Sequence, residues 1–231
     1  MIQLKTQKYY INIVKMAILV TVQGNIGSGK STLLERLRKR FQGNKSVCFL
    51  QEPLDIWNTI TDENNTPMLS LYYSDQKQYA FSFQMMAYIS RLHLLKKAIE
   101  DGFDIIISER SLATDKNVFA KMLYDDLKIK EVEYKIYLKW FDEFQKDFPK
   151  EHIIYMKTSP EVAHFRVNKR ARQGEDIPIE YLSNCHMYHE SWLSTDPMER
   201  LLIIEGDIDT DENPEIIDIW NTSVGNFLGL N

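Results

Sequence analysis

Residues 24–31 read GNIGSGKS, which fits the pattern G-x-x-x-x-G-K-[S/T] of a phosphate-binding P-loop. Glycines in such a loop let the backbone turn tightly, so that its amides point inward at a helix N-terminus and bind phosphate oxygens. In this pattern Lys30 supplies a positive charge to the β- and γ-phosphates, and Ser31 offers a hydroxyl to Mg²⁺. The stretch therefore predicts a site for the phosphates of a nucleoside triphosphate.

The sequence on either side supports this interpretation. Residues 17–22 (AILVTV) form an apolar, β-branched run that is typical of a buried parallel strand. Residues 31–40 carry apolar side chains at helical spacing, with basic residues late in the segment. Strand, glycine loop and helix in this order favour a P-loop over the alternative, an ordinary glycine-rich turn.

Bulk properties narrow the class of protein. The chain has 231 residues and a formal net charge of −5, which suits one α/β domain and argues against nonspecific binding to a nucleic-acid backbone. No apolar run approaches the length of a membrane span. The two cysteines, Cys48 and Cys185, form neither a disulfide framework nor a zinc pattern, so we expect the cytoplasm or another reducing compartment.

The remaining pattern predicts one domain. Residues 1–15 lack the features of a secretory signal or a transit peptide, so we expect a loose extension followed by a single domain over 16–231. Further strands are predicted at 46–51, 103–108, 152–157 and 201–205, and helices at about 75–101, 112–124, 130–148, 160–170, 179–193 and from 214, with a loop at 54–66. This alternation predicts an α/β fold, a five-stranded parallel sheet with helices on both faces.

Charged residues follow two of the predicted strands directly. Pro53 ends the second strand, which is expected to be buried, and so presents Glu52 at its carboxyl end. Glu109 and Arg110 follow the third strand. Because ligands of open α/β sheets bind at the carboxyl ends of the strands, we expect these side chains near the P-loop.

Two helical segments leave their role open. Gln84, Ala87 and Arg91 share one face of the long helix, and composition alone favours a solvent-exposed side. Residues 169–176 (KRARQGED) suggest a mobile lid that brings arginines over phosphates, although a solvated charged turn is the alternative.

Two further sequence patterns resemble those of a cofactor site and of a metal site. The aromatic side chains of 130–148 favour core or subunit packing over a cofactor box. The spacing of Cys185, His186 and His189 suggests zinc, but no second ligand pair accompanies it, so we do not expect a zinc site.

Several of these stretches together resemble the eukaryotic-type deoxynucleoside kinases, and in particular the branch of deoxycytidine and deoxyguanosine kinases. The similar stretches run in family order over almost the whole chain after Met16, and comprise residues 24–32, 51–53 with Trp57, 83–84, 109–111, 158–161, 170–172 and 189–193. The resemblance implies a P-loop kinase fold with an arginine-bearing lid, and ATP-dependent phosphorylation of a deoxynucleoside 5′-hydroxyl in nucleotide salvage.

The resemblance also implies catalytic roles. Glu52 would be the general base for the 5′-hydroxyl, and Arg110 would bind the substrate's 5′ end and steady Glu52. Arg170 and Arg172, with Lys30, would neutralise charge on the transferred phosphoryl group. Mg²⁺ would be held by Ser31 and Glu109. The residues implied for the phosphates of ATP are Gly24, Asn25, Ile26, Gly27, Ser28, Gly29, Lys30, Ser31 and Thr32.

The acceptor site follows from the same resemblance. The amide of Gln84 would pair with the base, Phe119 and Phe83 would stack on it, and Trp57 would lie nearby. Tyr73 (with Tyr72 as the neighbouring alternative) and Glu175 match positions that hold the 3′-hydroxyl. Ala87, Arg91 and Asp115 match the branch whose bases carry an exocyclic amino group, which implies deoxycytidine and purine deoxynucleosides over thymidine.

The resemblance also implies partners of the protein, and two alternative functions stay open. The resemblance implies a homodimer through helices around 84–100 and 130–148, with deoxynucleoside triphosphates as feedback inhibitors, and no nucleic-acid or membrane partner. One alternative is a nucleoside monophosphate kinase of the thymidylate type, and another is a catalytically inactive nucleotide-binding subunit. The full set of P-loop lysine, carboxylates and arginines argues for the deoxynucleoside kinase.

Overall fold

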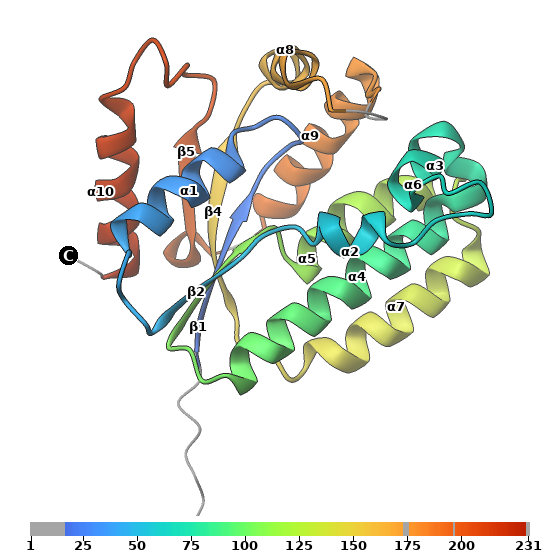
Figure 1. The fold of residues 1–231 in the computed structure, drawn as a ribbon, viewed down its shortest axis with the longest axis horizontal. Helices are drawn as coiled ribbons and strands as arrows, with labels where there is room; N and C mark the ends of the chain where they lie inside the picture. Colours follow the sequence, from blue (N-terminus) through green and yellow to red (C-terminus); the bar gives the residue numbers. More distant parts are fainter. Residues whose placement is uncertain (1–16, 173–175, 196, 230–231) are drawn as a thin grey trace, which may run out of the picture.

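The computed structural model describes residues 17–172, 176–195 and 197–229 (Figure 1). The expected N-terminal extension and Glu175 lie outside these residues. Within them, five strands form one sheet in the order β2-β3-β1-β4-β5, and every neighbouring pair is parallel. The strands are β1 (Ile18–Gln23), β2 (Val47–Leu50), β3 (Ile105–Glu109), β4 (Glu151–Lys157) and β5 (Leu201–Glu205). The predicted fold class is confirmed.

Helices cover both faces of this sheet (Figure 1). On one face, α1 (Lys30–Arg40) and α10 (Ile216–Leu228) bury Leu33, Leu37 and Trp220 against the strands. On the other face, α4 (Gln76–Glu100) and α7 (Glu131–Gln145) pack through Tyr88, Tyr137 and Phe141. The remaining helices are α2 (Leu54–Asn58), α3 (Met68–Ser74), α5 (Leu112–Thr114), η1 (Asp115–Ala120), α6 (Lys121–Asp125), α8 (Pro160–Arg170), α9 (Ile179–Leu193) and η2 (Met198–Arg200).

Two local expectations were wrong. The second strand, β2, is at the edge of the sheet and is only partly buried, because it has a single neighbouring strand. Residues 54–58 form helix α2 instead of a loop, and Trp57 on this helix is buried. One and a half turns are too short to show a helical period in the sequence.

The segment after β3 is helical as expected, but its middle part is a π-helix. Residues 115–120 form η1, between the short α-helices α5 and α6. A π-turn widens the helix locally, and such turns occur frequently at functional sites. This segment carries Asp115 and Phe119, so its geometry decides how both side chains are presented.

Candidate active site

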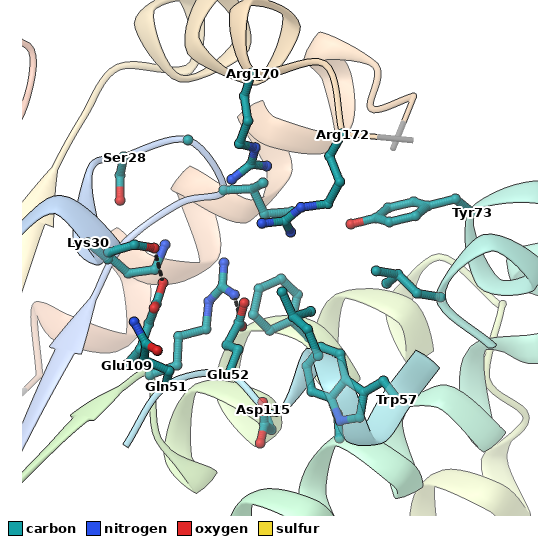
Figure 2. Close-up of a pocket in the computed structure, with 18 of the residues that line it drawn as sticks. Ser28, Lys30, Gln51, Glu52, Trp57, Tyr73, Glu109, Asp115, Arg170 and Arg172 are labelled. Atoms are coloured by element: carbon teal, nitrogen blue, oxygen red, sulfur yellow. Dashed lines mark hydrogen bonds and ion pairs between the residues drawn. The ribbon is translucent and has the colours of Figure 1, made fainter. Parts of the chain in front are cut away.

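A cavity of about 630 Å³ lies at the carboxyl ends of β1, β2 and β3 (Figure 2). Its walls come from the loop before α1, from α2, α3, α4 and η1, and from the end of α8. The residues predicted from sequence that line it are Ile26, Gly27, Ser28, Gly29, Lys30, Ser31, Thr32, Glu52, Trp57, Tyr73, Phe83, Gln84, Ala87, Arg91, Glu109, Arg110, Asp115, Phe119, Arg170 and Arg172. Gly24 and Asn25 belong to the same loop but do not line the cavity.

The loop before α1 has the geometry of an anion cradle. Gly24 has a φ of +142°, and a Cβ built there would lie 2.7 Å from the carbonyl oxygen of Met156, so no other residue fits. Gly29 caps α1 with a φ of +93°. Asn25 ties the loop to α9, since its Nδ2 donates to the carbonyl oxygen of Leu182 at 2.8 Å. The loop therefore has a fixed shape with its amides at a helix N-terminus.

The same loop also provides a positive charge and a hydroxyl group, both of which suit the binding of phosphate. Lys30 is buried and its Nζ donates to the carbonyl oxygen of Asn25 at 2.6 Å. Burial, together with the charge of Arg110, lowers the pKa of Lys30 to about 7. The Oγ of Ser28 is buried without a hydrogen-bond partner among the described residues. A bound polyphosphate would satisfy this hydroxyl and stabilise the ammonium.

A hydroxyl and a carboxylate meet beside this cradle. Ser31 Oγ donates to Glu109 Oε1 at 2.9 Å. Hard oxygen ligands of this kind suit Mg²⁺, which takes few protein ligands and completes its shell with water and phosphate oxygens. The described residues hold no cluster of three or more His, Cys, Asp or Glu side chains, so any metal here depends on such additional ligands.

Glu52 is held in an ion-pair network. Arg110 Nη1 donates to Glu52 Oε1, and Arg91 Nη2 lies 3.7 Å from the same oxygen. Burial alone raises the pKa of Glu52, but the charges of Arg110, Arg91 and Lys30 outweigh it and lower the pKa to about 2. The carboxylate is thus ionised at neutral pH and points into the cavity.

Arg110 itself has an unusual backbone. It follows β3 with a φ of +60°, a left-handed conformation that is uncommon for residues other than glycine. Its guanidinium carbon lies 5.0 Å from the ring centre of Phe119. Non-glycine residues in this conformation cluster at functional sites, where surrounding contacts hold them.

The helix face that carries Gln84, Ala87 and Arg91 is buried and lines the cavity. The solvent-exposed side that composition favours is therefore wrong. Arg91 Nε donates to Asp115 Oδ2 at 3.0 Å, and its Nη1 donates to the carbonyl oxygen of Glu109 at 2.7 Å. The Oε1 of Gln84 is buried without a hydrogen-bond partner among the described residues, so the amide is free to recognise a ligand.

Aromatic rings form the walls next to Gln84. The rings of Trp57 and Phe83 meet edge to face at 5.4 Å, and Trp57 Nε1 donates to Ser90 Oγ at 2.9 Å. Phe119 also lines the cavity, from η1. A slot with aromatic walls and an unpaired amide suits a flat heterocycle.

Comparison with known proteins agrees with this chemistry. The family model for deoxynucleoside kinase matches residues 20–225. This chain belongs to the deoxynucleoside kinase family. It is an enzyme that phosphorylates deoxynucleosides, as the sequence resemblance implied.

Individual relatives of this deoxynucleoside kinase carry different substrate names. A Fowlpox virus (strain NVSL) protein named probable deoxycytidine kinase is 37% identical over 179 residues, which cover 76% of this chain and 71% of that protein. The mitochondrial deoxyguanosine kinase of Xenopus laevis is 33% identical over 195 residues, covering 76% and 72% of the two chains. The mitochondrial thymidine kinase 2 of Homo sapiens is 33% identical over 196 residues, covering 82% and 71%. Family membership alone therefore does not select the base.

The kinase also has arginines above the cavity. Arg170 ends α8 and Arg172 follows it, and both side chains point into the cavity from the same side (Figure 2). Ala171 between them has a φ of +48°, so the chain turns sharply at this position. The part of the expected lid at 173–175, including Glu175, lies outside the described residues.

Several cavity residues of the kinase were missed by sequence reasoning. They are Gln51, Leu54, Leu69, Arg166, Lys169 and Tyr181. Arg166 lies one helical turn before Arg170, a spacing that could have revealed it. Tyr181 had no such signal. The hydroxyl of Tyr181 lies 2.9 Å from that of Tyr72, and the ring of Tyr72 stacks on that of Phe83 with 4.4 Å between the ring centres. Tyr72 and Tyr73 both line the cavity.

Cys185 and His189 are both buried in α9. His189 Nδ1 lies 2.7 Å from the carbonyl oxygen of Cys185, a helical i, i+4 contact, and burial lowers the pKa of this histidine to about 3. The buried Cys185 and His189 thus belong to the packing of α9. Cys48 and Cys185 are both free thiols. In the described residues, no helix is long and apolar enough to cross a membrane.

Proposed function

We propose that this kinase transfers the γ-phosphoryl group of ATP to the 5′-hydroxyl of deoxynucleosides, and favours deoxycytidine and purine deoxynucleosides over thymidine. The observation that carries the preference is the buried ion pair of Arg91 and Asp115, with 3.0 Å between Nε and Oδ2. This pair shares the cavity with the unpaired amide of Gln84.

The preference follows from matching donors with acceptors. An exocyclic amino group donates hydrogen bonds, and a carboxylate such as that of Asp115 only accepts them. Thymine presents a carbonyl oxygen where cytosine has its amino group, so the same site would leave two acceptors facing each other. A buried polar site rejects a ligand that leaves its groups unpaired. The small side chain of Ala87 leaves room for the larger purines.

Glu52 would take the proton of the 5′-hydroxyl. Its carboxylate is ionised, and the contact with Arg110 fixes its orientation. A carboxylate whose pKa is about 2 is a weak base. It therefore fits a loose transition state, in which the hydroxyl keeps its proton until phosphoryl transfer is well advanced.

The donor side would be formed by the P-loop and the arginines. Residues 24–32 would bind the phosphates of ATP, and Lys30, Arg170 and Arg172 would face the transferred group (Figure 2). Ser31 and Glu109 would hold Mg²⁺, which supplies charge neutralisation on the phosphates when it is bound.

We also propose that two copies associate through α4 and α7. These helices lie side by side on one face of the molecule (Figure 1). Large apolar side chains are exposed along them, namely Ile89, Val132, Ile136, Trp140 and Phe144. An exposed patch of this kind supports an interaction surface.

Steady-state kinetics with single substrates test the proposal. Purified protein with ATP and Mg²⁺ is given deoxycytidine, deoxyadenosine, deoxyguanosine, thymidine or thymidine monophosphate. We expect kcat/KM for deoxycytidine and at least one purine deoxynucleoside to exceed that for thymidine about 10-fold or more. Turnover of thymidine monophosphate alone would instead identify a monophosphate kinase, and no turnover of any substrate would identify an inactive subunit.

A further inference from the structure

A buried polar cluster lies between the P-loop and the strand end that carries Glu109 and Arg110. Its centre is Gln23, the last residue of β1, which is fully buried. The Nε2 of Gln23 donates to Thr21 Oγ1 at 2.9 Å and to Ser111 Oγ at 3.0 Å. Its Oε1 accepts from Thr114 Oγ1. The amide thus uses both of its protons and its oxygen.

The directions of these hydrogen bonds are determined by one carboxylate. Thr21 Oγ1 donates to Glu151 Oε2 at 2.9 Å, and a carboxylate only accepts, so Thr21 accepts from Gln23. This places the Nε2 of Gln23 toward Thr21 and its Oε1 toward Thr114. Because Thr114 spends its proton on Oε1, the contact of 3.3 Å between the hydroxyls of Ser111 and Thr114 has Ser111 as the donor. Each side-chain proton in the cluster has one acceptor.

The two partners of Gln23 after β3 begin the segment that builds the acceptor site. Ser111 caps α5, since its Oγ accepts from the backbone N of Thr114 at 3.3 Å and its own N donates to Thr114 Oγ1 at 3.2 Å. Arg110 precedes this cap and Asp115 follows it. The bonds from Gln23 therefore hold α5 at its N-cap, Ser111, and at its last residue, Thr114.

The backbone at Arg110 needs such support. Its φ of +60° is an unfavourable conformation for a residue other than glycine, and it persists only where the surroundings hold it. The main-chain bond from Arg110 N to Val22 O, at 3.0 Å, fixes one end of this turn. Gln23 lies next to Val22 on β1 and fixes the other end through Ser111 and Thr114.

We propose that Gln23 is a positioning residue for phosphoryl transfer. Its side-chain amide holds the left-handed turn at Arg110, and through this turn it sets where Arg110 and Asp115 stand relative to the P-loop. The inference rests on the proposed roles of these two residues. Within the described residues, the side chain of Gln23 donates to Thr21 and Ser111 and accepts from Thr114, and it makes no hydrogen bond to the phosphate cradle. Loss of the amide is therefore expected to disturb the acceptor side and to leave ATP binding in place.

The test is Gln23→Met, which keeps the length of the side chain and removes its hydrogen bonds. We expect kcat to fall about 10- to 100-fold and KM for deoxycytidine to rise, while Kd for ATP changes by less than about 3-fold. Gln23→Glu is the rescue variant, because the hydroxyls of Ser111 and Thr114 can both donate to a carboxylate, and only the bond to Thr21, whose proton goes to Glu151, is lost. It is expected to recover kcat to within about 5-fold of the wild type.

A matched control separates positioning from a general loss of packing. Tyr88→Phe removes a part-buried hydrogen bond, to the carbonyl oxygen of Trp140 at 3.3 Å, at a residue that does not line the cavity. Its kcat should stay within about 2-fold of the wild type. If Gln23→Met does not fold, Thr114→Val replaces it, since valine has the same shape as threonine without the proton that Gln23 accepts. We expect the same loss of kcat at unchanged ATP affinity.

Three outcomes would overturn the inference. They are a folded Gln23→Met or Thr114→Val enzyme with kcat within about 2-fold of the wild type, a fall of ATP affinity that matches the fall of kcat, and failure of Gln23→Glu to recover activity. Failure of the proposed roles is recognised separately. In that case Arg110→Met retains wild-type turnover, or the wild type phosphorylates no deoxynucleoside.

Discussion

Removing the negative charge of Asp115 should affect both stability and base preference. In the native enzyme, its carboxylate is 3.0 Å from Nε of Arg91, and the two side chains are only 4% and 5% exposed. Breaking a buried pair by removing one partner costs about 3–5 kcal/mol, because an uncompensated charge stays behind. Arg91 keeps the carbonyl oxygen of Glu109 at 2.7 Å and Glu52 at 3.7 Å. We therefore expect the lower end, about 3 kcal/mol, for Asp115→Asn.

Thermal unfolding measures this cost against a matched control. About 3 kcal/mol corresponds to a fall in Tm of about 6–12 °C for a chain of this size. The control is Asp142→Asn, which removes the same charge from the ion pair with Lys116 at 2.9 Å, where the side chains are 64% and 28% exposed. An exposed pair contributes about 0–1 kcal/mol, so the control should lose at most about 4 °C.

The same variant changes the chemistry of the base site. An asparagine amide can donate to the carbonyl oxygen of thymine, whereas a carboxylate cannot. We expect kcat/KM for deoxycytidine relative to thymidine to fall about 10- to 100-fold in Asp115→Asn. The double variant Arg91→Met/Asp115→Leu should regain at least half of the lost stability, since it leaves no unpaired charge, and should still lack the preference.

The reasoning is refuted if Asp115→Asn loses no more stability than Asp142→Asn. It is also refuted if the variant is destabilised as expected but keeps the base preference of the wild type. The first result would mean that the buried pair contributes nothing to the fold, and the second that another group selects the base.

Further predictions concern the catalytic groups. Glu52→Gln should lower kcat about 10²- to 10⁴-fold at unchanged Kd for ATP, and near-normal turnover would remove Glu52 from the role of base. Because the pKa of Glu52 is held at about 2, this carboxylate stays ionised until the pH falls toward that value, so the pH profile of kcat/KM should show no acid limb from it above pH about 4. A limb near pH 6 in Mg²⁺-saturated assays that shifts in Arg110→Lys would contradict this. Glu109→Gln should raise the Mg²⁺ concentration for half-maximal activity about 10-fold, and an unchanged requirement would exclude it as a ligand. Gly24→Ala should weaken ATP binding measured by calorimetry, because its Cβ would meet the carbonyl oxygen of Met156; wild-type affinity would contradict a rigid cradle.

The strand ends could be predicted because they follow from topology. A parallel sheet brings the carboxyl ends of all its strands to one edge, so Glu52, Glu109 and Arg110 were expected near the P-loop before their contacts were known. The burial of the helix face that carries Gln84 and Arg91 could not be predicted in this way. Periodicity placed these residues on one side of a helix, but burial depends on η1 and α2, which are distant in sequence.

Other parts of the site carried no local signal. Sequence periodicity does not predict the π-helix η1, so only the family resemblance identified Asp115 and Phe119 as candidate site residues. Gln23 appears in the sequence as the last residue of an apolar strand, and its partners Ser111 and Thr114 lie about 90 residues later. Hydrogen bonds between segments so far apart become visible only in the folded chain.

A one-pot competition tests the central claim most directly. The four deoxynucleosides are mixed at equal concentrations below KM with ATP, Mg²⁺ and the wild-type enzyme. The monophosphates formed at early times are then separated, and their amounts are compared. Their ratios equal the ratios of kcat/KM, which report differences in transition-state binding. We expect the deoxycytidine and purine 5′-monophosphates together to exceed thymidine 5′-monophosphate about 10-fold or more. Thymidine 5′-monophosphate as the main product would contradict it.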